Sequence, residues 1–327
     1  MRTAPALLLS IMATAAGCSS NQSALDPHGA PAIHVEHLII GITIICSIVW
    51  VLVMAMLGWA LMRERSSDSS QPRLLALTVS TAVAATVVII AGLTVASFYT
   101  TRSIGLPENG ALTITVRGQQ WWWQVLYADP DPALSFQTAN EIHIPVGHDV
   151  RIQLESADVV HSFWVPSLAG KQDLVPGRNN SLLLRAERPG IYRGQCAEFC
   201  GLQHTHMAMM IVVDEPADYE RWAAAQRENG VTPTDQDAAA GKVAFLSKPC
   251  AACHTVRGTP ATGTAGPDLT HIGSRQTIAA GLLETTRGSL AAWIADPQTL
   301  KPGNNMPMVP LSSIELRDIS AYMESLK

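Results

Sequence analysis

Two cysteines, a histidine and a methionine lie together in one short stretch of the chain, Cys196–Met207. The stretch reads Cys-Ala-Glu-Phe-Cys-Gly-Leu-Gln-His-Thr-His-Met, so thiolate, imidazole and thioether groups are all available there. A mononuclear blue-copper site needs one thiolate, two histidines and a weak axial sulfur. A second thiolate four residues later allows both sulfurs to bridge a pair of copper ions. The stretch therefore predicts a dinuclear copper site.

Each copper of such a pair needs a nitrogen ligand, and His204 supplies only one of the two. His161 is the candidate for the other, because residues 155–166 are typical of a strand that runs into a proline-marked turn. The flanks of the cysteine loop, residues 190–195 and 207–213, also have the composition of strands. We expect one ligand from an earlier strand and the rest from a loop that joins the last two strands.

Three other interpretations of this stretch remain open. The two cysteines could form a disulfide, which an exported domain permits. Two cysteines and two histidines could also bind zinc, although a zinc site gives no role to Met207. Finally, His206 or Met209 could be the ligand in place of His204 or Met207. Spacing favours His204 and Met207, and strand alternation would place Met209 in the core of a barrel.

A second redox motif, Cys250-Ala-Ala-Cys253-His254, lies near the C-terminus. This pattern is the attachment signature of a c-type haem, in which both cysteines form thioethers and the histidine binds the iron. A redox-active dithiol would need only the two cysteines, so the adjacent histidine favours haem. We therefore predict a covalent haem c held by Cys250, Cys253 and His254.

The haem iron needs a sixth ligand, and a methionine sulfur favours the reduced state. Met306 and Met308 are both available downstream, and we choose Met306 because its Asn-Met-Pro context resembles the ligand loop of small bacterial cytochromes c. Met308 is the alternative. Residues 266–269, Gly-Pro-Asp-Leu, strengthen this resemblance, since the proline carbonyl in that class orients the proximal histidine.

The copper motif also carries a family resemblance. The chain resembles subunit II of the haem-copper cytochrome c oxidases, whose copper centre has the pattern Cys-x-Glu-x-Cys-x-x-x-His-x-x-Met, and every position matches. Residues 158–166 and 171–178 continue the match. The resemblance implies that Glu198 gives its backbone carbonyl to copper and its carboxylate to a magnesium ion shared with subunit I. It also implies that the copper pair binds the side chains of His161, Cys196, Cys200, His204 and Met207.

A tryptophan-rich segment, residues 118–124, is similar to one that this family carries just outside the membrane. Trp121 matches the family residue that lies between the electron-donor surface and copper. An interfacial aromatic belt is the other interpretation, and it applies to Trp122 and Trp123. Trp122 and Val125 stand where the family usually has tyrosines, so the resemblance implies an altered donor surface.

Two apolar stretches, residues 35–62 and 74–98, are long enough to cross a bilayer. Arg63, Arg65 and Arg73 lie between them, so the positive-inside rule places this loop in the cytoplasm and both ends of the hairpin outside. The second stretch lacks the glutamate that family members often place near a proton path. Proton uptake therefore needs another route.

The N-terminal residues 1–17 have the basic start, short apolar core and small residues of a signal peptide. Cys18 follows Ala-Gly and resembles the lipidated cysteine of bacterial lipoproteins; plain signal cleavage is the alternative. The six cysteines divide into two for copper, two for haem, one for lipid and Cys46 in the first membrane helix. This division leaves no pair for a structural disulfide.

The chain of 327 residues is therefore expected to be a multidomain membrane protein, and its net charge of −5 gives little information about partners. Phosphate loops, basic patches and repeats are missing from the sequence, so nucleotides and nucleic acid are not indicated. A capping box at Ser312–Glu315 is expected to start the last helix. The expected parts are an N-terminal segment with a two-helix transmembrane hairpin (18–110), an all-β cupredoxin domain (111–214), a charged linker (215–236) and an all-α class I cytochrome c domain (237–327).

The resemblance implies subunit II of a caa-type respiratory oxidase in a bacterial inner membrane, with both metal domains on the periplasmic or extracellular side. The haem would take an electron from cytochrome c or a quinol–cytochrome c reductase and pass it to copper. Subunit I, accompanied by subunit III, would then reduce oxygen to water, so no catalytic residue is expected in this chain. The alternatives are the electron-accepting subunit of a copper-containing nitric oxide reductase and a membrane-bound shuttle. A quinol oxidase subunit is disfavoured because it lacks the copper ligands.

Overall fold

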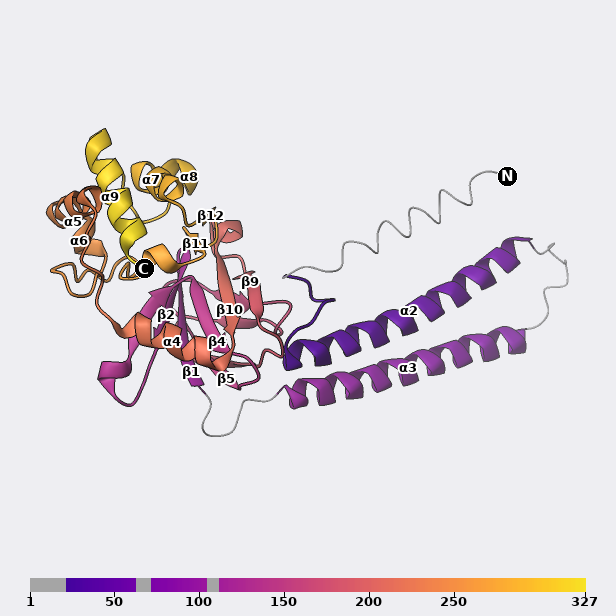
Figure 1. Cartoon of the computed structure of the whole chain (residues 1–327). Coiled ribbons are helices and arrows are strands. Elements are labelled where there is room, and N and C mark those ends of the chain that lie inside the picture. The colour runs from indigo at the N-terminus through magenta and orange to yellow at the C-terminus, as the bar shows by residue number, and fades with distance from the viewer. Residues whose placement is uncertain (1–21, 63–71, 105–111) are drawn as a thin grey trace, which may run out of the picture. The chain divides into compact units, whose positions relative to one another are not determined.

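The computed structural model describes residues 22–62, 72–104 and 112–327. The expected signal peptide, the expected lipidation site Cys18 and the arginines at positions 63 and 65 lie outside these residues. Contacts divide the described chain into two compact units. One consists of the two long helices, and the other contains the sheets and the remaining helices (Figure 1).

The two long helices are α2, Ala30–Met62, and α3, Pro72–Ser103. Both are long and apolar enough to cross a membrane, with mean hydropathies of 2.8 and 2.4 in their most apolar windows. Their apolar side chains are exposed on all faces, which fits a helix surrounded by lipid. Threonine hydroxyls in these helices donate to the carbonyl four residues earlier, so they need no water: Thr43, Thr78, Thr81, Thr86 and Thr94.

Two five-stranded sheets form the β domain. The first has the order β3 (Phe136–Ala139), β2 (Trp122–Tyr127), β1 (Leu112–Gln119), β5 (Val150–Ser156) and β8 (Asn180–Leu184). The second has the order β4 (Glu141–Pro145), β10 (Ala208–Asp214), β9 (Gly190–Cys196), β6 (His161–Trp164) and β7 (Gln172–Leu174). The β1–β5 and β4–β10 pairs are parallel, and the other neighbouring pairs are antiparallel.

One hydrophobic core lies between these sheets, because alternate side chains of each strand point inward. Trp123 is fully buried there and meets the ring of Phe163 edge-on, with ring centroids 6.1 Å apart. Trp123 is therefore a core residue, and the aromatic-belt interpretation does not apply to it. Other fully buried members from both sheets are Ile114, Val116, Ile152, Leu154, Leu174 and Ile211.

The C-terminal part is mostly helical, and its last helix begins at the expected capping box, in which Ser312 and Glu315 bond each other's backbone. Gly241 of the first of these helices would place an added Cβ 1.9 Å from the main-chain oxygen of Asp318, so only glycine fits this helix crossing. The elements are α5 (Gln236–Ser247), α6 (Cys250–Cys253), β11 (Thr277–Ile278), β12 (Leu283–Glu284), α7 (Arg287–Ala295), α8 (Pro297–Leu300) and α9 (Ser313–Ser325).

The segment between the two domains contains α4, Pro216–Arg227, and this helix packs on the β domain. Trp222 stacks on the imidazole of His143, with ring centroids 4.0 Å apart and an interplanar angle of 10°. After α4, the guanidinium of Arg257 donates to the carbonyls of Gln226 and Arg227. The linker is therefore fixed to both domains. Three 3-10 turns complete the described structure: η1 (Pro132–Leu134), η2 (His204–His206) and η3 (Ile272–Ser274).

The predicted fold class is confirmed. The described residues combine two long apolar helices, a β-sheet domain of the cupredoxin kind and a mostly helical domain around the Cys-x-x-Cys-His motif.

Candidate copper and haem centres

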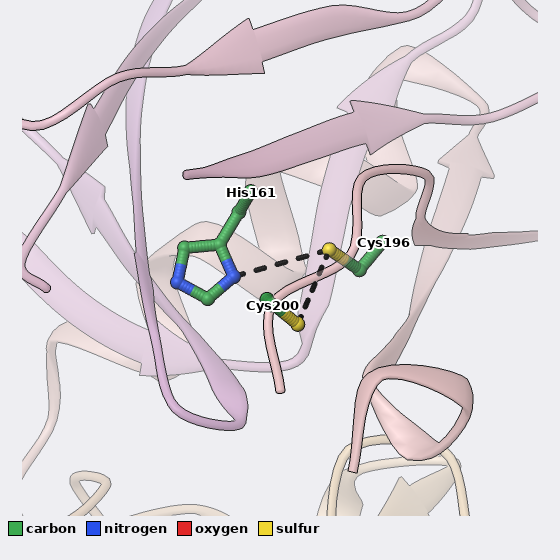
Figure 2. A group of neighbouring side chains, drawn as sticks. All are labelled: His161, Cys196 and Cys200. Atoms are coloured by element: carbon green, nitrogen blue, oxygen red, sulfur yellow. Dashed lines mark hydrogen bonds between the residues drawn. The ribbon is translucent and has the colours of Figure 1, made fainter. Parts of the chain in front are cut away.

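The predicted copper ligands His161, Cys196 and Cys200 come together at one end of the β domain (Figure 2). His161 begins β6, Cys196 ends β9, and Cys200 lies in the loop that follows β9. The Sγ atom of Cys196 lies 3.9 Å from Nδ1 of His161 and 3.7 Å from Sγ of Cys200. All three residues are buried. Thus an earlier strand and a later loop jointly supply soft ligands to one place.

The other residues of the motif surround the same pair of sulfurs. Nδ1 of His204 lies 3.6 Å from Sγ of Cys200, and Sδ of Met207 lies 3.8 Å from it. The carbonyl oxygen of Glu198 lies 3.2 Å from Sγ of Cys196. A metal pair placed between the sulfurs would therefore find nitrogen, thioether and carbonyl donors within reach.

The imidazole of His161 is oriented by its surroundings. Its Nε2 bonds to Oδ1 of Asp158 at 2.8 Å, which leaves Nδ1 facing the sulfurs. Gly118 makes room for the ring, because an added Cβ would lie 2.9 Å from Cδ2 of His161. Burial lowers the pKa of His161, but its bonds to Cys196 and Asp158 outweigh burial, so the pKa is raised.

The two neighbouring thiols shift each other's pKa in opposite directions. The hydrogen bond from Cys200 lowers the pKa of Cys196, and the same partner and burial raise the pKa of Cys200. Two thiolates at this separation would repel each other. A bound cation would favour the second thiolate, because metal ligation releases the thiol proton.

The alternative ligands occupy other environments. His206 is exposed, and its Nδ1 bonds to Oε1 of Gln203 at 2.9 Å. Met209 is fully buried in β10, where an added Cβ on Gly194 would lie 3.0 Å from its Cγ. Met209 therefore belongs to the core, as strand alternation predicts. Cys196 and Cys200 are free cysteines.

A cavity of about 420 Å³ lies beside α6. Its lining includes Cys250, Cys253, His254 and Met306, which are the four residues predicted to hold a haem. Met308 is 59% exposed and is not part of the lining. Apolar side chains make up much of the remaining wall, and all of those named here except Leu269 come from helices: Phe245, Leu269, Leu290, Trp293, Ile294 and Ile319.

The neighbours of His254 fix the orientation of its imidazole ring. Its Nδ1 bonds to the carbonyl of Pro267 at 2.8 Å, which confirms the role expected for that proline and leaves Nε2 free to bind a metal. Burial lowers the pKa of His254 and so keeps the imidazole neutral. Gly266 is needed here, because an added Cβ would lie 2.5 Å from Cε1 of His254.

Arg275 also lines this cavity and is buried. Its Nη2 donates to the carbonyl of Asp268, while its Nε has no partner among the described residues. A buried guanidinium N–H without an acceptor is costly. The cavity therefore fits a group that carries a carboxylate, as haem does. Arg275 lies in a loop and carries no motif, so the sequence alone did not reveal it.

The β domain closes part of the same cavity. Gln120, Trp121, Trp122 and Asn140 belong to its lining, although they lie more than a hundred residues before the haem motif. Trp121 is only 8% exposed, and its Nε1 donates to the carbonyl of Cys200 at 3.0 Å. Trp121 therefore touches a predicted copper ligand and also lines the haem cavity.

Two sequence profiles match the chain. The profile described as cytochrome c oxidase subunit II, periplasmic domain, matches residues 112–215. The profile described as cytochrome c matches residues 238–327. Together they span both the copper motif and the haem motif.

Two relatives and one solved structure are similar to this chain. Cytochrome c oxidase subunit 2 of Alkalihalophilus pseudofirmus is 34% identical over 339 residues, which span 100% of this chain and 97% of the relative. The subunit 2 of Bacillus subtilis is 30% identical over 234 residues, spanning 68% of this chain and 64% of the relative. The crystal structure of the periplasmic domain of subunit II of cytochrome oxidase from Bradyrhizobium japonicum covers 38% of this chain and 97% of its own, with 32% identity and a TM-score of 0.35. The full-length match shows that the chain belongs to the cytochrome c oxidase subunit II family, in a form with a fused C-terminal cytochrome c domain.

Proposed function

We propose that this chain receives electrons at its haem domain, passes them by way of Trp121 to a dinuclear copper site, and delivers them to subunit I for the reduction of oxygen to water. One observation carries the proposal. Trp121 lines the cavity that contains the candidate haem ligands, and its indole N–H bonds to the carbonyl of Cys200 in the copper site. A single side chain thus contacts both predicted centres.

The copper site uses residues that the fold already brings together. His161, Cys196, Cys200, His204 and Met207 would hold the metals by their side chains, and Glu198 by its carbonyl. When bound, a copper pair supplies one-electron transfer in which the charge is shared between two metals. The protein contributes a buried setting and fixed donors, so the ligands move little as the charge changes.

The haem domain would hold its cofactor through Cys250 and Cys253, with His254 and Met306 as the axial ligands. Met306 is preferred to Met308 because it lines the cavity, whereas Met308 is exposed. A thioether ligand favours the reduced iron. The buried Arg275 would receive a carboxylate of the cofactor.

A magnesium ion at Glu198 has less support. The carboxylate of Glu198 lies 3.7 Å from the ammonium of Lys171, and the two form an ion pair at the surface. A magnesium ion would have to compete with this lysine for the carboxylate. The proposal therefore gives Glu198 a role through its carbonyl and does not depend on magnesium.

Two apolar helices anchor the chain in the membrane. We infer that the membrane is the bacterial inner membrane and that both metal domains, divided at about residues 215–236, face the periplasmic or extracellular side. Subunits I and III are the expected neighbours.

Because Trp121 is almost fully covered, an external donor such as cytochrome c or a quinol–cytochrome c reductase would deliver its electron to the haem domain. Removal of residues 1–17 and lipidation of Cys18 remain predictions.

Purification of the complex from membranes in mild detergent tests this function. We expect oxygen uptake with reduced cytochrome c, a c-type haem spectrum, and the electron paramagnetic resonance signal of a mixed-valence copper pair. Both metal signals without oxygen uptake in an intact complex would contradict an oxidase. Anaerobic consumption of nitric oxide by that complex would then indicate a nitric oxide reductase, and no turnover of either gas would indicate a shuttle.

A further inference from the structure

A buried lysine lies where the β domain meets the haem domain. Lys301 is only 3% exposed, and no carboxylate of the described residues lies within ion-pair distance of its ammonium. Burial lowers its pKa to about 7, but only the protonated form has three N–H donors for the three carbonyls around Nζ. A methionine could fill the same space without burying a charge, so packing alone does not account for a lysine here.

All three N–H bonds of the ammonium are used. Nζ donates to the main-chain oxygen of Trp121 at 2.8 Å, of His206 at 2.7 Å and of Ala279 at 3.0 Å. An ammonium group has three donors, so its capacity is fully satisfied by these carbonyls. Two of the carbonyls belong to the β domain and one belongs to the haem domain. The side chain thus joins three separate segments at one point.

Two of these segments, and the loop that carries Lys301 itself, belong to the predicted electron path. Trp121 lies in the turn between β1 and β2, and His206 immediately precedes the candidate copper ligand Met207. On its own side, Lys301 begins the loop that ends at Met306. Asn304 ties this loop together, because its Nδ2 donates to the carbonyl of Lys301 and its Oδ1 accepts the N–H of Met306.

The turn that supplies Ala279 has an unusual backbone. Ala279 and Ala280 have φ angles of 54° and 61°, in the left-handed region that residues other than glycine avoid. In this conformation the carbonyl of Ala279 faces Lys301, and the carbonyl of Ala280 accepts the N–H of Ala208 at 2.9 Å. The contacts with Lys301 and with the β domain offset the cost of the turn.

We propose that Lys301 is a positioning residue, whose ammonium holds the haem-ligand loop against Trp121 and the copper-ligand loop and so sets the separation of the two redox centres. This inference rests on the proposed path from haem to copper. Electron transfer slows steeply as the distance between two centres grows. Loss of the three hydrogen bonds is therefore expected to act on the transfer rate while each centre stays intact.

The test compares the wild-type oxidase complex with Lys301→Met and with Lys242→Met as the matched control. Lys242 lies on α5 of the same domain, and among the described residues no hydrogen bond or ion pair joins its side chain to the β domain. The haem is reduced by a flash with a ruthenium bipyridyl complex, and the absorbance of haem and copper is followed. We expect transfer from haem to copper to slow about tenfold or more in Lys301→Met, since charge-assisted bonds at the interface are lost, and to be unchanged in Lys242→Met.

The static spectra of haem and copper and the haem reduction potential serve as readouts of intact centres. If Lys301→Met fails to assemble, Lys301→Gln, which keeps two N–H donors on a shorter side chain, takes its place. Slowed transfer with unchanged spectra and potential supports the proposal. Transfer at the wild-type rate in an assembled variant would overturn it. If the wild-type haem does not reduce copper at all, the proposed function fails instead, so the two failures are distinguishable.

Discussion

The indole Nε1 of Trp121 donates a hydrogen bond to the main-chain oxygen of Cys200, 3.0 Å away. This bond joins the turn between β1 and β2 to the copper-ligand loop, 79 residues later in the chain. The Nε2 of Gln120 donates to the same carbonyl at 2.6 Å. Trp121 is therefore held in a fixed orientation beside one candidate copper ligand while it lines the haem cavity.

Two substitutions of Trp121 separate the hydrogen bond from the aromatic ring. Trp121→Phe keeps a ring and loses the N–H, whereas Trp121→Leu loses both. We expect transfer from haem to copper to slow by about tenfold in the first variant and further in the second. Flash photoreduction of the haem measures both rates. If both variants transfer electrons from haem to copper at the wild-type rate, a path through Trp121 is ruled out.

Substitution of each histidine in the copper loop tests the assignment of ligands. His204→Asn removes a nitrogen 3.6 Å from Sγ of Cys200 and is expected to abolish or strongly change the mixed-valence copper signal. His206→Asn is the matched control, because that exposed side chain bonds only to Gln203 among the described residues. Electron paramagnetic resonance and copper content decide the matter. Loss of copper in His206→Asn but not in His204→Asn would reverse the assignment.

The axial ligand of the haem can be assigned by a pair of leucine substitutions. Met306→Leu should remove the near-infrared charge-transfer band that ferric haem shows with a methionine ligand, and should lower the reduction potential. Met308→Leu should leave both unchanged, because Met308 is exposed. The opposite pattern would make Met308 the ligand.

His143 is expected to make stability depend on pH. Burial lowers its pKa, but bonds to Asp214 at 2.7 Å and Glu141 at 3.2 Å outweigh burial and raise it. The protonated histidine therefore stabilises the fold at pH values below its unfolded pKa of about 6.5, and this contribution is lost as the pH rises through the higher folded pKa.

Melting temperatures of the wild type and His143→Gln measure this effect. The difference between them should be largest at mildly acidic pH and should shrink at alkaline pH. His148→Gln serves as the control, since His148 is exposed and bonds only to a nearby carbonyl among the described residues. A difference that does not change with pH would show that His143 acts by packing on Trp222 alone.

The helix crossing at Gly241 gives a prediction about the haem domain alone. Gly241→Ala should destabilise the domain by about 1–3 kcal/mol, because the added methyl group meets the backbone of α9. Gly288→Ala in α7 meets only one atom, 3.9 Å away, and should be neutral or stabilising. Thermal unfolding followed by haem absorbance compares the two. Similar stability in both variants would contradict the close contact of α5 with α9.

The chemistry of this chain could be predicted where the residues that carry it lie close together in the sequence. The copper loop and the haem motif each place most of their predicted ligands within a few residues, so residue type and spacing pointed to them, whereas His161 and Met306 lie 35 and 52 residues away. The two membrane helices and the capping box at Ser312 are also local patterns. Alternation along a strand explains why Trp122 and Trp123 have different environments, because neighbouring side chains of β2 point to opposite faces. Trp122 lines the haem cavity, and Trp123 fills the core.

The contacts between the two metal domains were not predictable in this way. Lys301 meets the carbonyl of Trp121 across 180 residues of sequence, and Gln276 donates to the carboxylate of Glu141 across 135. Lys301 belongs to no motif, and the donor at Gln276 is its main-chain N–H, which does not depend on residue type. Their roles follow only from the packing of one domain on the other.

The order of reduction of the two centres tests the central claim most directly. The intact oxidase is mixed with reduced cytochrome c in a stopped-flow instrument, and haem and copper are followed together. The account predicts that the haem is reduced first, and that copper is then reduced as the haem is reoxidised, at a rate independent of oxidase concentration. Reduction of copper before the haem, or at a rate that rises with oxidase concentration, would contradict it.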